Sequence, residues 1–144
     1  MLTLDDILEN FEFLDDWEDK YRYVIELGRT MPEFPDDKRT ADYKVEGCVS
    51  QVWLVKSIEE NSDDPVLTYY GDSDAHIVKG LVALVLKAFS DRKASEIIAF
   101  DTDNMFNQIG LREHLTPQRS NGLSAMVNRI KRDAADARLA DTAS

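Results

Sequence analysis

Apolar and polar positions divide the chain into a helical first part and a strand-bearing middle. Their spacing predicts a short helix over residues 3–14, with Thr3 as its N-cap. A second helix is predicted from Asp15 or Asp16 to about Thr30. Its apolar face contains Trp17, Tyr21, Val24, Ile25 and Leu27.

After Tyr43 the pattern changes to the alternation of a β-strand. Residues 51–58 read as one strand and residues 66–70 as another, and the turn between them at 61–65 makes a hairpin. Residues 43–46 are the candidate for a short third strand. We therefore expect an antiparallel sheet of about three strands.

The most apolar segment, residues 75–90, is predicted to be a central helix packed on that sheet. Ser73 or Asp74 is the expected N-cap. Gly80 lies inside this helix at a cost of about 1 kcal/mol relative to alanine, so we expect it to allow close backbone packing against the sheet. The other predicted segments are an extended loop at 31–43, short helices at 94–100 and 103–109, a polar connection at 114–120, a last helix at 121–139 and a frayed tail at 140–144.

Helices before and after a clustered hairpin are typical of an α+β fold, here a small antiparallel sheet packed with helices. The length fits a single domain over residues 1–144 with a core at about 3–139. The formal net charge of −11 argues against nucleic acid and anionic membranes as partners, although a basic protein surface stays open. There is no apolar run of about 18 residues and no signal-peptide layout at the start. We expect a cytoplasmic protein.

The chain has a single cysteine, Cys48, directly after Gly47. One cysteine cannot form an internal disulfide or a cysteine-rich metal site, but it can carry out thiol chemistry. The glycine permits a tight loop that displays the thiol. From local sequence alone, an inert buried cysteine is the commoner case.

A reactive thiol needs a lower pKa than the ordinary value of about 8.5. Glu46 opposes this, whereas Arg119, Arg39 and Lys44 are candidate cations. Arg119 is favoured because it precedes the predicted last helix, whose N-terminus also attracts anions.

The remaining polar candidates have simpler interpretations. His76 is interpreted as a capping or surface residue, and His114 as a residue that orders its loop by hydrogen bonding. No paired-histidine metal spacing occurs. Asp72 and Asp74 are interpreted as strand-end and helix-cap residues, since no ligands follow at calcium-loop spacing.

The segment around the cysteine, Gly47-Cys48-Val49-Ser50-Gln51-Val52-Trp53, resembles the active-cysteine segment of the SufE family, the sulfur-acceptor partners of cysteine desulfurases. Three further blocks resemble the family in the same order. They lie within Trp17–Gly28, Gly71–Leu81 and His114–Leu123. The resemblance extends from about Phe11 to Arg132, although His76 departs from the small residue that the family pattern has there.

The resemblance implies a SufE/IscU-like fold and a persulfide relay. Cys48 would take sulfur from a SufS-type or CsdA-type desulfurase, stimulate that enzyme and pass the sulfur to an iron–sulfur scaffold. The pyridoxal phosphate belongs to the desulfurase, so no cofactor or metal is expected on this chain. The resemblance also implies four supporting residues. Asp74 would dock the partner or hold the loop, and Arg119 would steady an anionic sulfur. Asp72 and Gly47 are the other two.

Such a protein is a sulfur carrier and activator rather than a stand-alone enzyme. The alternative is a noncatalytic acidic adaptor or allosteric activator that needs no thiol. An independent cysteine hydrolase would need a base within reach of Cys48, and neither histidine has a context that favours this.

Overall fold

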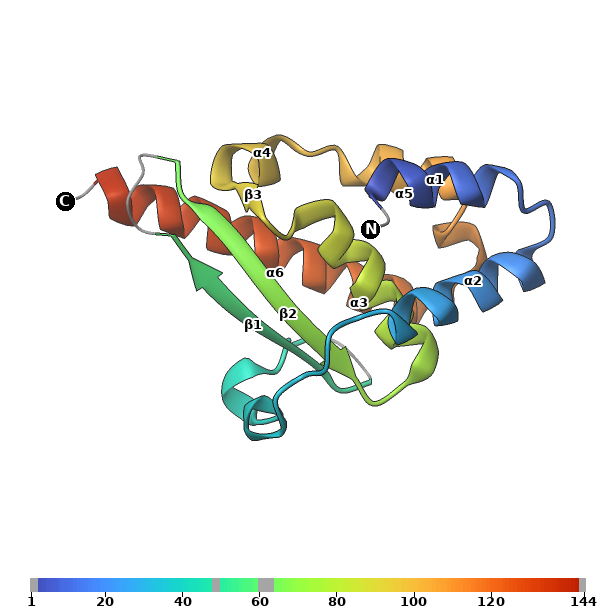
Figure 1. The fold of residues 1–144 in the computed structure, drawn as a ribbon, viewed down its shortest axis with the longest axis horizontal. Coiled ribbons are helices and arrows are strands. Elements are labelled where there is room, and N and C mark those ends of the chain that lie inside the picture. Colours follow the sequence, from blue (N-terminus) through green and yellow to red (C-terminus); the bar gives the residue numbers. More distant parts are fainter. Residues whose placement is uncertain (1–2, 48–49, 60–63, 143–144) are drawn as a thin grey trace.

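The structure, a computed structural model, describes residues 3–47, 50–59 and 64–142 and combines helices with a small sheet (Figure 1). Its helices are α1 (Leu4–Glu12), α2 (Trp17–Arg29), α3 (His76–Phe89), α4 (Ala94–Ala99), α5 (Thr102–Ile109) and α6 (Pro117–Thr142). Its strands are β1 (Val52–Ile58), β2 (Val66–Ser73) and β3 (Arg92–Lys93). Short 3₁₀ turns are η1 (Asp36–Lys38), η2 (Ala41–Tyr43) and η3 (Arg112–His114).

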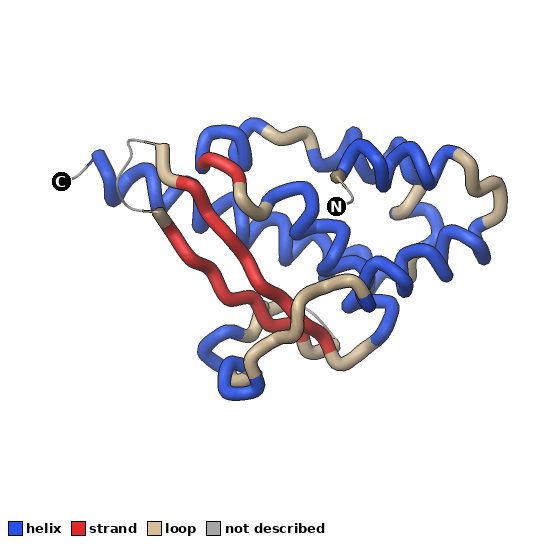
Figure 2. Tube along the Cα trace, viewed as in Figure 1, coloured by secondary structure: helices blue, strands red, loops and turns tan. Residues whose placement is uncertain are grey.

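The sheet is antiparallel in the order β1-β2-β3, which confirms the predicted α+β class (Figure 2). The prediction of the third strand, however, is wrong. Residues 43–46 form no strand, because only Lys44 bridges to Trp53. The third strand is instead β3, which pairs with Val66 and Leu67. Two residues are too short to show an alternating pattern in the sequence.

Helix α3 is central, as predicted, and contacts α2, β2 and α6. The prediction that Gly80 faces the sheet is wrong, because this glycine lies against α2. A Cβ added to Gly80 would lie 2.0 Å from the carbonyl oxygen of Val24, and one added to Gly28 would lie 2.8 Å from the amide nitrogen of Gly80. The two glycines therefore let the backbones of α2 and α3 come close together.

The helix caps at the start of the chain are those predicted. Thr3 and Asp6 form a capping box at α1, and Asp16 accepts a hydrogen bond from the backbone of Glu18 at α2. At α3 the cap prediction is wrong. The N-cap there is Ala75, which has no side-chain oxygen, and the carboxylate of Asp74 is used elsewhere.

Helix α6 begins four residues earlier than the predicted 121, within the supposed polar connection. Pro117 is its first residue, a favoured position for proline because the first amides of a helix need no intrahelical acceptor. Thr116 caps the helix, since its hydroxyl accepts from the amide of Arg119 (3.3 Å) and its carbonyl from that of Ser120 (2.9 Å). Arg119 therefore lies in the first turn of α6 rather than before the helix.

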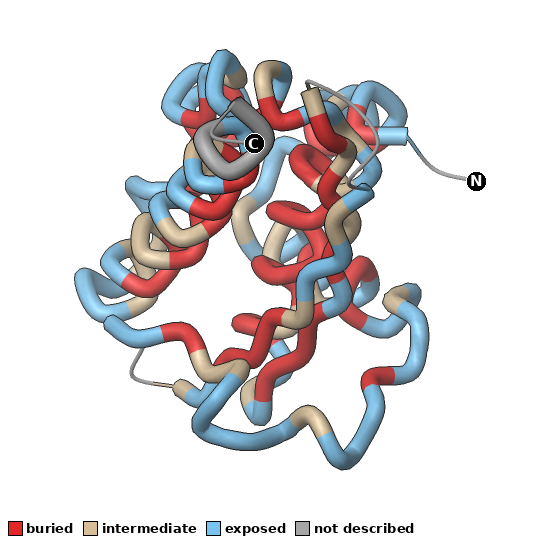
Figure 3. Tube along the Cα trace, turned by 90° about the vertical axis from the view of Figure 1, so that its left-hand side faces the viewer, coloured by how far each residue is buried: buried red, intermediate tan, exposed pale blue. Residues whose placement is uncertain are grey.

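A buried polar cluster attaches α6 to the sheet. Asp133 is 6% exposed and accepts a hydrogen bond from the Tyr69 hydroxyl (3.0 Å). The same carboxylate pairs with Lys56 of β1 (3.3 Å) and is near Arg129 (3.7 Å). Figure 3 shows buried positions along the faces where helices and strands meet. None of the helices within the described ranges is long and apolar enough to cross a membrane.

Candidate functional site

The residues that flank the cysteine in the sequence are joined to each other beside the sheet. The amide of Val45 donates to the carbonyl of Val52 (2.8 Å), and Lys44 bridges to Trp53. Described residues before and after the cysteine are thereby paired with each other. Cys48 itself lies outside the described residues, together with Val49.

On the exit side of the loop, Gln51 is joined to Asp74 by hydrogen bonds in both directions. The amide of Gln51 donates to Asp74 Oδ1 (3.1 Å), and the amide of Asp74 donates to the carbonyl of Gln51 (3.3 Å). The Gln51 side-chain amide lies 3.4 Å from Asp74 Oδ2. Asp74 thus anchors the loop at the point where β2 ends. From its position in the sequence alone, Asp74 is expected only as a helix cap.

On the entry side, Gly47 lies against α6. Its φ of +90° is in the region that L side chains rarely adopt. A Cβ built on Gly47 would lie 3.2 Å from Cβ of Ala125. Both the backbone angle and the neighbouring helix therefore favour glycine directly before the cysteine.

A cavity of about 340 Å³ opens beside the loop. Ser50 lines it from the loop, and Arg119 lines it from the first turn of α6. Its other lining residues are mainly apolar and come from α3, from α6 and from the cap residue before α6: Val78, Leu81, Thr116, Gln118, Gly122, Leu123 and Met126. The structure thus brings Arg119 to the same cavity as a loop residue two positions beyond the cysteine.

Asp72 does not face this cavity. It is 5% exposed and pairs with Arg39, whose Nε and Nη2 lie 2.9 and 2.8 Å from Oδ2. Lys79 lies 3.5 Å from Oδ1. The hydrogen bond to Asp72 raises the pKa of Arg39, with a smaller contribution from Asp36. Arg39 therefore holds the 31–43 segment on the end of β2.

The pairing of Asp72 with Arg39 was not predicted from the sequence. A signal for it existed, because a carboxylate next to an apolar strand is expected to be buried and a buried carboxylate needs a cation. Lys44, the other candidate cation, is placed by its backbone bridge to Trp53. The sequence contained no direct sign that Gln51 would pair with Asp74.

The histidines lie elsewhere. His76 is exposed at the start of α3. His114 stacks on Trp17, with ring centroids 4.4 Å apart and planes 15° from parallel. His114 was expected to order its loop by hydrogen bonding, and the side-chain contact found is instead this stacking on Trp17. Among the described residues, no three His, Cys, Asp or Glu side chains are grouped so as to hold a metal ion.

Known proteins resemble this chain over almost its whole length. An uncharacterized SufE-like protein of Rhizobium meliloti (strain 1021) is 56% identical over 134 residues, which cover 93% of this chain and 96% of that protein. An uncharacterized SufE-like protein of Rhizobium etli is 55% identical over 134 residues, covering 93% and 90% of the two chains.

The fold agrees with a solved structure as well. The solution structure of a hypothetical protein from Thermus thermophilus superimposes with a TM-score of 0.72 at 20% identity, covering 95% of this chain and 98% of that one. The sequence model of the SufE family, described as an Fe-S metabolism associated domain, matches residues 5–134. With relatives above 50% identity and a family match that includes the cysteine loop, this chain belongs to the SufE family.

Proposed function

We propose that this protein accepts sulfur from a cysteine desulfurase as a persulfide on Cys48 and passes it to an iron–sulfur assembly scaffold. The observation that carries the proposal is the position of the single cysteine. In the sequence it falls between Val45 and Gln51, two residues that the structure anchors by hydrogen bonds, in a chain that belongs to a family associated with Fe-S metabolism.

The chemistry is thiol exchange. The Cys48 thiolate attacks the terminal sulfur of the persulfide on the desulfurase. The bond between the two sulfurs of the desulfurase breaks, and its electron pair leaves with the enzyme's cysteine as a thiolate. A new bond joins the transferred sulfur to Cys48 Sγ. The exchange keeps the total number of electrons and protons, so it needs no external oxidant, reductant or metal.

The cavity beside the loop supports a sheltering role. Ser50, two positions after Cys48 in the sequence, lines the cavity. A persulfide is readily oxidised, so shelter against the apolar side chains of α3 and α6 would protect it. To deliver the sulfur, the loop would then have to move out of this cavity when the protein binds its partner.

The charged residues near the loop would serve two purposes. Arg119, at the rim of the cavity and in the first turn of α6, is placed to stabilise an anionic sulfur together with the helix N-terminus. Asp74 would hold the loop through Gln51, and Gly47 would allow it to turn. Asp72 would act indirectly by fixing the adjacent segment through Arg39.

The proposed partners are a SufS-type or CsdA-type desulfurase, which brings the pyridoxal phosphate, and the scaffold that receives the sulfur. No cofactor is proposed on this chain, and the proposed location is the cytoplasm, where a lone thiol stays reduced. The protein would raise the turnover of the desulfurase by removing its bound sulfur, without being an enzyme on its own.

The test is mass spectrometry of the protein after incubation with a desulfurase and cysteine. We expect a gain of about one sulfur atom on the peptide that contains Cys48, removed by reductant. Cys48→Ser should abolish both this gain and the stimulation of the desulfurase while binding persists. Stimulation by Cys48→Ser that equals the wild type would instead establish an allosteric activator.

The adaptor alternative makes a different prediction. Binding through the acidic surface alone would weaken steeply with salt and would not respond to alkylation of Cys48. Alkylated protein that still stimulates the desulfurase fully would therefore refute the relay.

A further inference from the structure

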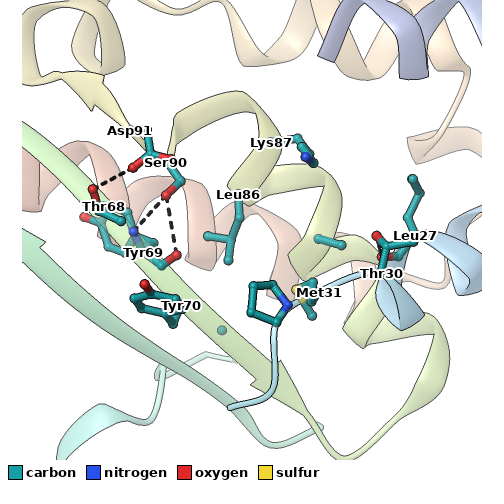
Figure 4. Close-up of a pocket in the computed structure, with 13 residues that line it drawn as sticks. Leu27, Thr30, Met31, Thr68, Tyr69, Tyr70, Leu86, Lys87, Ser90 and Asp91 are labelled. Carbon is teal, nitrogen blue, oxygen red and sulfur yellow. Dashed lines mark hydrogen bonds between the residues drawn. The ribbon is translucent and has the colours of Figure 1, made fainter. Parts of the chain in front are cut away.

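A second hollow, on another side of α3, is unrelated to the cysteine loop. It is a groove of about 610 Å³ between β2, the C-terminal end of α2 and α3 (Figure 4). Leu27, Met31 and Leu86 supply apolar walls, and Tyr70, which is 46% exposed, lies at its edge. A groove of this size has room for several side chains.

The floor of the groove is an edge of the sheet. The amide of Glu59, directly after β1, donates to the carbonyl of Val66 (3.0 Å), so even-numbered positions of β2 bond to β1 and odd-numbered positions point away from it. At the outer edge, the carbonyl of Leu67 accepts from Asp91 (2.8 Å). The amide of Tyr69 donates to the Ser90 hydroxyl (2.8 Å), which replaces a strand partner.

Gly71 is the next outward-pointing position, and it lines the groove. Within the described part of the chain, no group bonds to its outward amide or carbonyl. Strand β3 does not extend along β2 as far as Gly71, since it pairs only with Val66 and Leu67. An unpaired amide and carbonyl in strand geometry at the floor of a groove match another backbone, because main-chain groups in proteins are nearly always paired.

We propose that this groove binds an extended segment of a protein partner, which adds to the edge of β2 by pairing its backbone with Gly71. The residue opposite Gly71 exchanges both hydrogen bonds with it. Its side chain points to the same sheet face as a Cβ on Gly71 would, toward Val82 and Leu86 of α3. That side chain is therefore apolar, and its two neighbours in the segment point to the exposed face and are polar.

The wall of the groove opposite β2 offers little backbone pairing, so the bound segment forms strand hydrogen bonds with β2 alone. Met31 and Pro32 line the groove opposite β2, and proline has no amide hydrogen to donate. A bound segment would thus pair with β2 on one side and pack on side chains on the other. This is the arrangement of strand-addition sites, in which backbone bonds supply affinity and one or two pockets supply specificity.

The proposal is independent of the sulfur chemistry. Helix α3 contributes Val78 and Leu81 to the cavity beside the cysteine loop but Ala83 and Leu86 to the groove, and the two hollows share no lining residue. A partner bound in the groove therefore leaves the cysteine loop free to act. A failure of the relay would leave this site intact, and the reverse also holds.

The test selects displayed random peptides of about ten residues against the full-length protein. We expect the selected peptides to alternate apolar and polar residues. By NMR, a synthetic copy should shift the amides of Gly71, Met31 and Leu86 and slow hydrogen exchange at Gly71 at least about tenfold. N-methylation of the peptide residue opposite Gly71 should weaken binding at least about tenfold, because it removes a strand hydrogen bond.

Variants of the protein make the test specific. Met31→Asp places a charge in the groove wall at a half-buried loop position and should weaken peptide binding at least about tenfold. The matched control is Ile98→Asp, at an apolar residue that is 40% exposed and outside the groove, which should leave binding unchanged. The proposal is overturned if no peptide binds, if selected peptides perturb another surface, or if Met31→Asp binds them as the wild type does. Binding that is indifferent to N-methylation would also overturn it, since the groove would then be a side-chain pocket.

Discussion

Asp74 and Gln51 hold each other by reciprocal hydrogen bonds, with each backbone amide donating to an oxygen of the other residue. The distances are 3.1 Å to Asp74 Oδ1 and 3.3 Å to the carbonyl of Gln51. This pair joins the exit of the cysteine loop to the point where β2 ends. The exit of the loop is therefore held by a side chain that lies directly after β2.

Asp74→Ala is expected to loosen the loop without unfolding the protein. The substitution removes hydrogen bonds to an exposed carboxylate, each contributing about 0.5–1.5 kcal/mol. Alkylation of Cys48 should accelerate by up to about tenfold, which corresponds to about 1.4 kcal/mol of loop anchoring. The measurement is the rate of thiol alkylation at neutral pH, together with hydrogen exchange of the peptide over residues 46–51.

Asp101→Ala is the matched control. Asp101 is also exposed and also accepts a backbone hydrogen bond, from Asn104 at 3.0 Å, but at the start of α5. This variant should leave the alkylation rate of Cys48 unchanged. Equal rates in the wild type and in Asp74→Ala would show that Asp74 does not restrain the loop.

The ion pair of Asp72 with Arg39 should contribute measurably to stability. Arg39→Gln leaves a carboxylate that is 5% exposed with only Lys79 nearby among the described cations, at 3.5 Å. Breaking a buried pair costs about 3–5 kcal/mol, and we expect about 2–3 kcal/mol here because the Arg39 side chain is 32% exposed and Lys79 remains. Urea denaturation gives the free energy of unfolding.

Further variants separate this effect from a general loss of charge. Arg29→Gln removes an exposed pair with Glu26 and should cost less than about 0.5 kcal/mol. Arg39→Gln combined with Asp72→Asn should cost less than the sum of the two single variants, because either single change already removes the pair between these two residues. Additive costs would mean that the two residues do not interact.

Local signals predicted much of the fold. The caps at Thr3 and Asp16 were predicted correctly because a cap and its helix are adjacent in the sequence. The errors were at positions decided by distant contacts. Strand β3 exists because Leu67 and its neighbour offer a free edge, and Gly80 faces Val24 of α2 rather than the sheet. Periodicity shows that a face is buried but not which element covers it.

The candidate site shows the same division. Cys48 and the glycine before it are proposed as site residues from the sequence and from its resemblance to the family. Asp74 was expected as a helix cap because it stands at a helix start, yet it bonds to Gln51, 23 positions earlier. Nothing local indicates that choice, since the same carboxylate could satisfy either backbone amide.

Gly80→Ala should be among the most destabilising single substitutions in the molecule. The added Cβ would lie 2.0 Å from the carbonyl oxygen of Val24, so α2 and α3 would have to separate. We expect a loss of about 3 kcal/mol or more in the free energy of unfolding. Gly110→Ala is the control, because no atom lies within 4 Å of its added Cβ and only its φ of +75° is unfavourable. It should cost about 1 kcal/mol, and equal costs in urea denaturation would refute the close packing of α2 and α3.

Tyr69 should make the protein sensitive to alkaline pH. Burial raises the pKa of its phenol, and the negative charge of Asp133 raises it further. Because the folded-state pKa lies above the unfolded value of about 10, this contribution to stability is fully present below about pH 10. Above that pH the unfolded chain loses the proton while the folded protein keeps it, so stability falls by up to about 1.4 kcal/mol per pH unit.

Tyr69→Phe removes this effect. At neutral pH it should cost about 1–3 kcal/mol, because Asp133 loses a buried donor at 3.0 Å. As the pH rises above about 10, the difference in stability between wild type and variant should shrink, because only the wild type still loses stability through this residue. Urea denaturation at about pH 8 and about pH 11 measures it. Phe89→Leu, a change at a fully buried apolar residue, should cost the same at both values. A difference between wild type and Tyr69→Phe that stays constant with pH would mean that Tyr69 ionises as readily in the folded protein as in the unfolded chain.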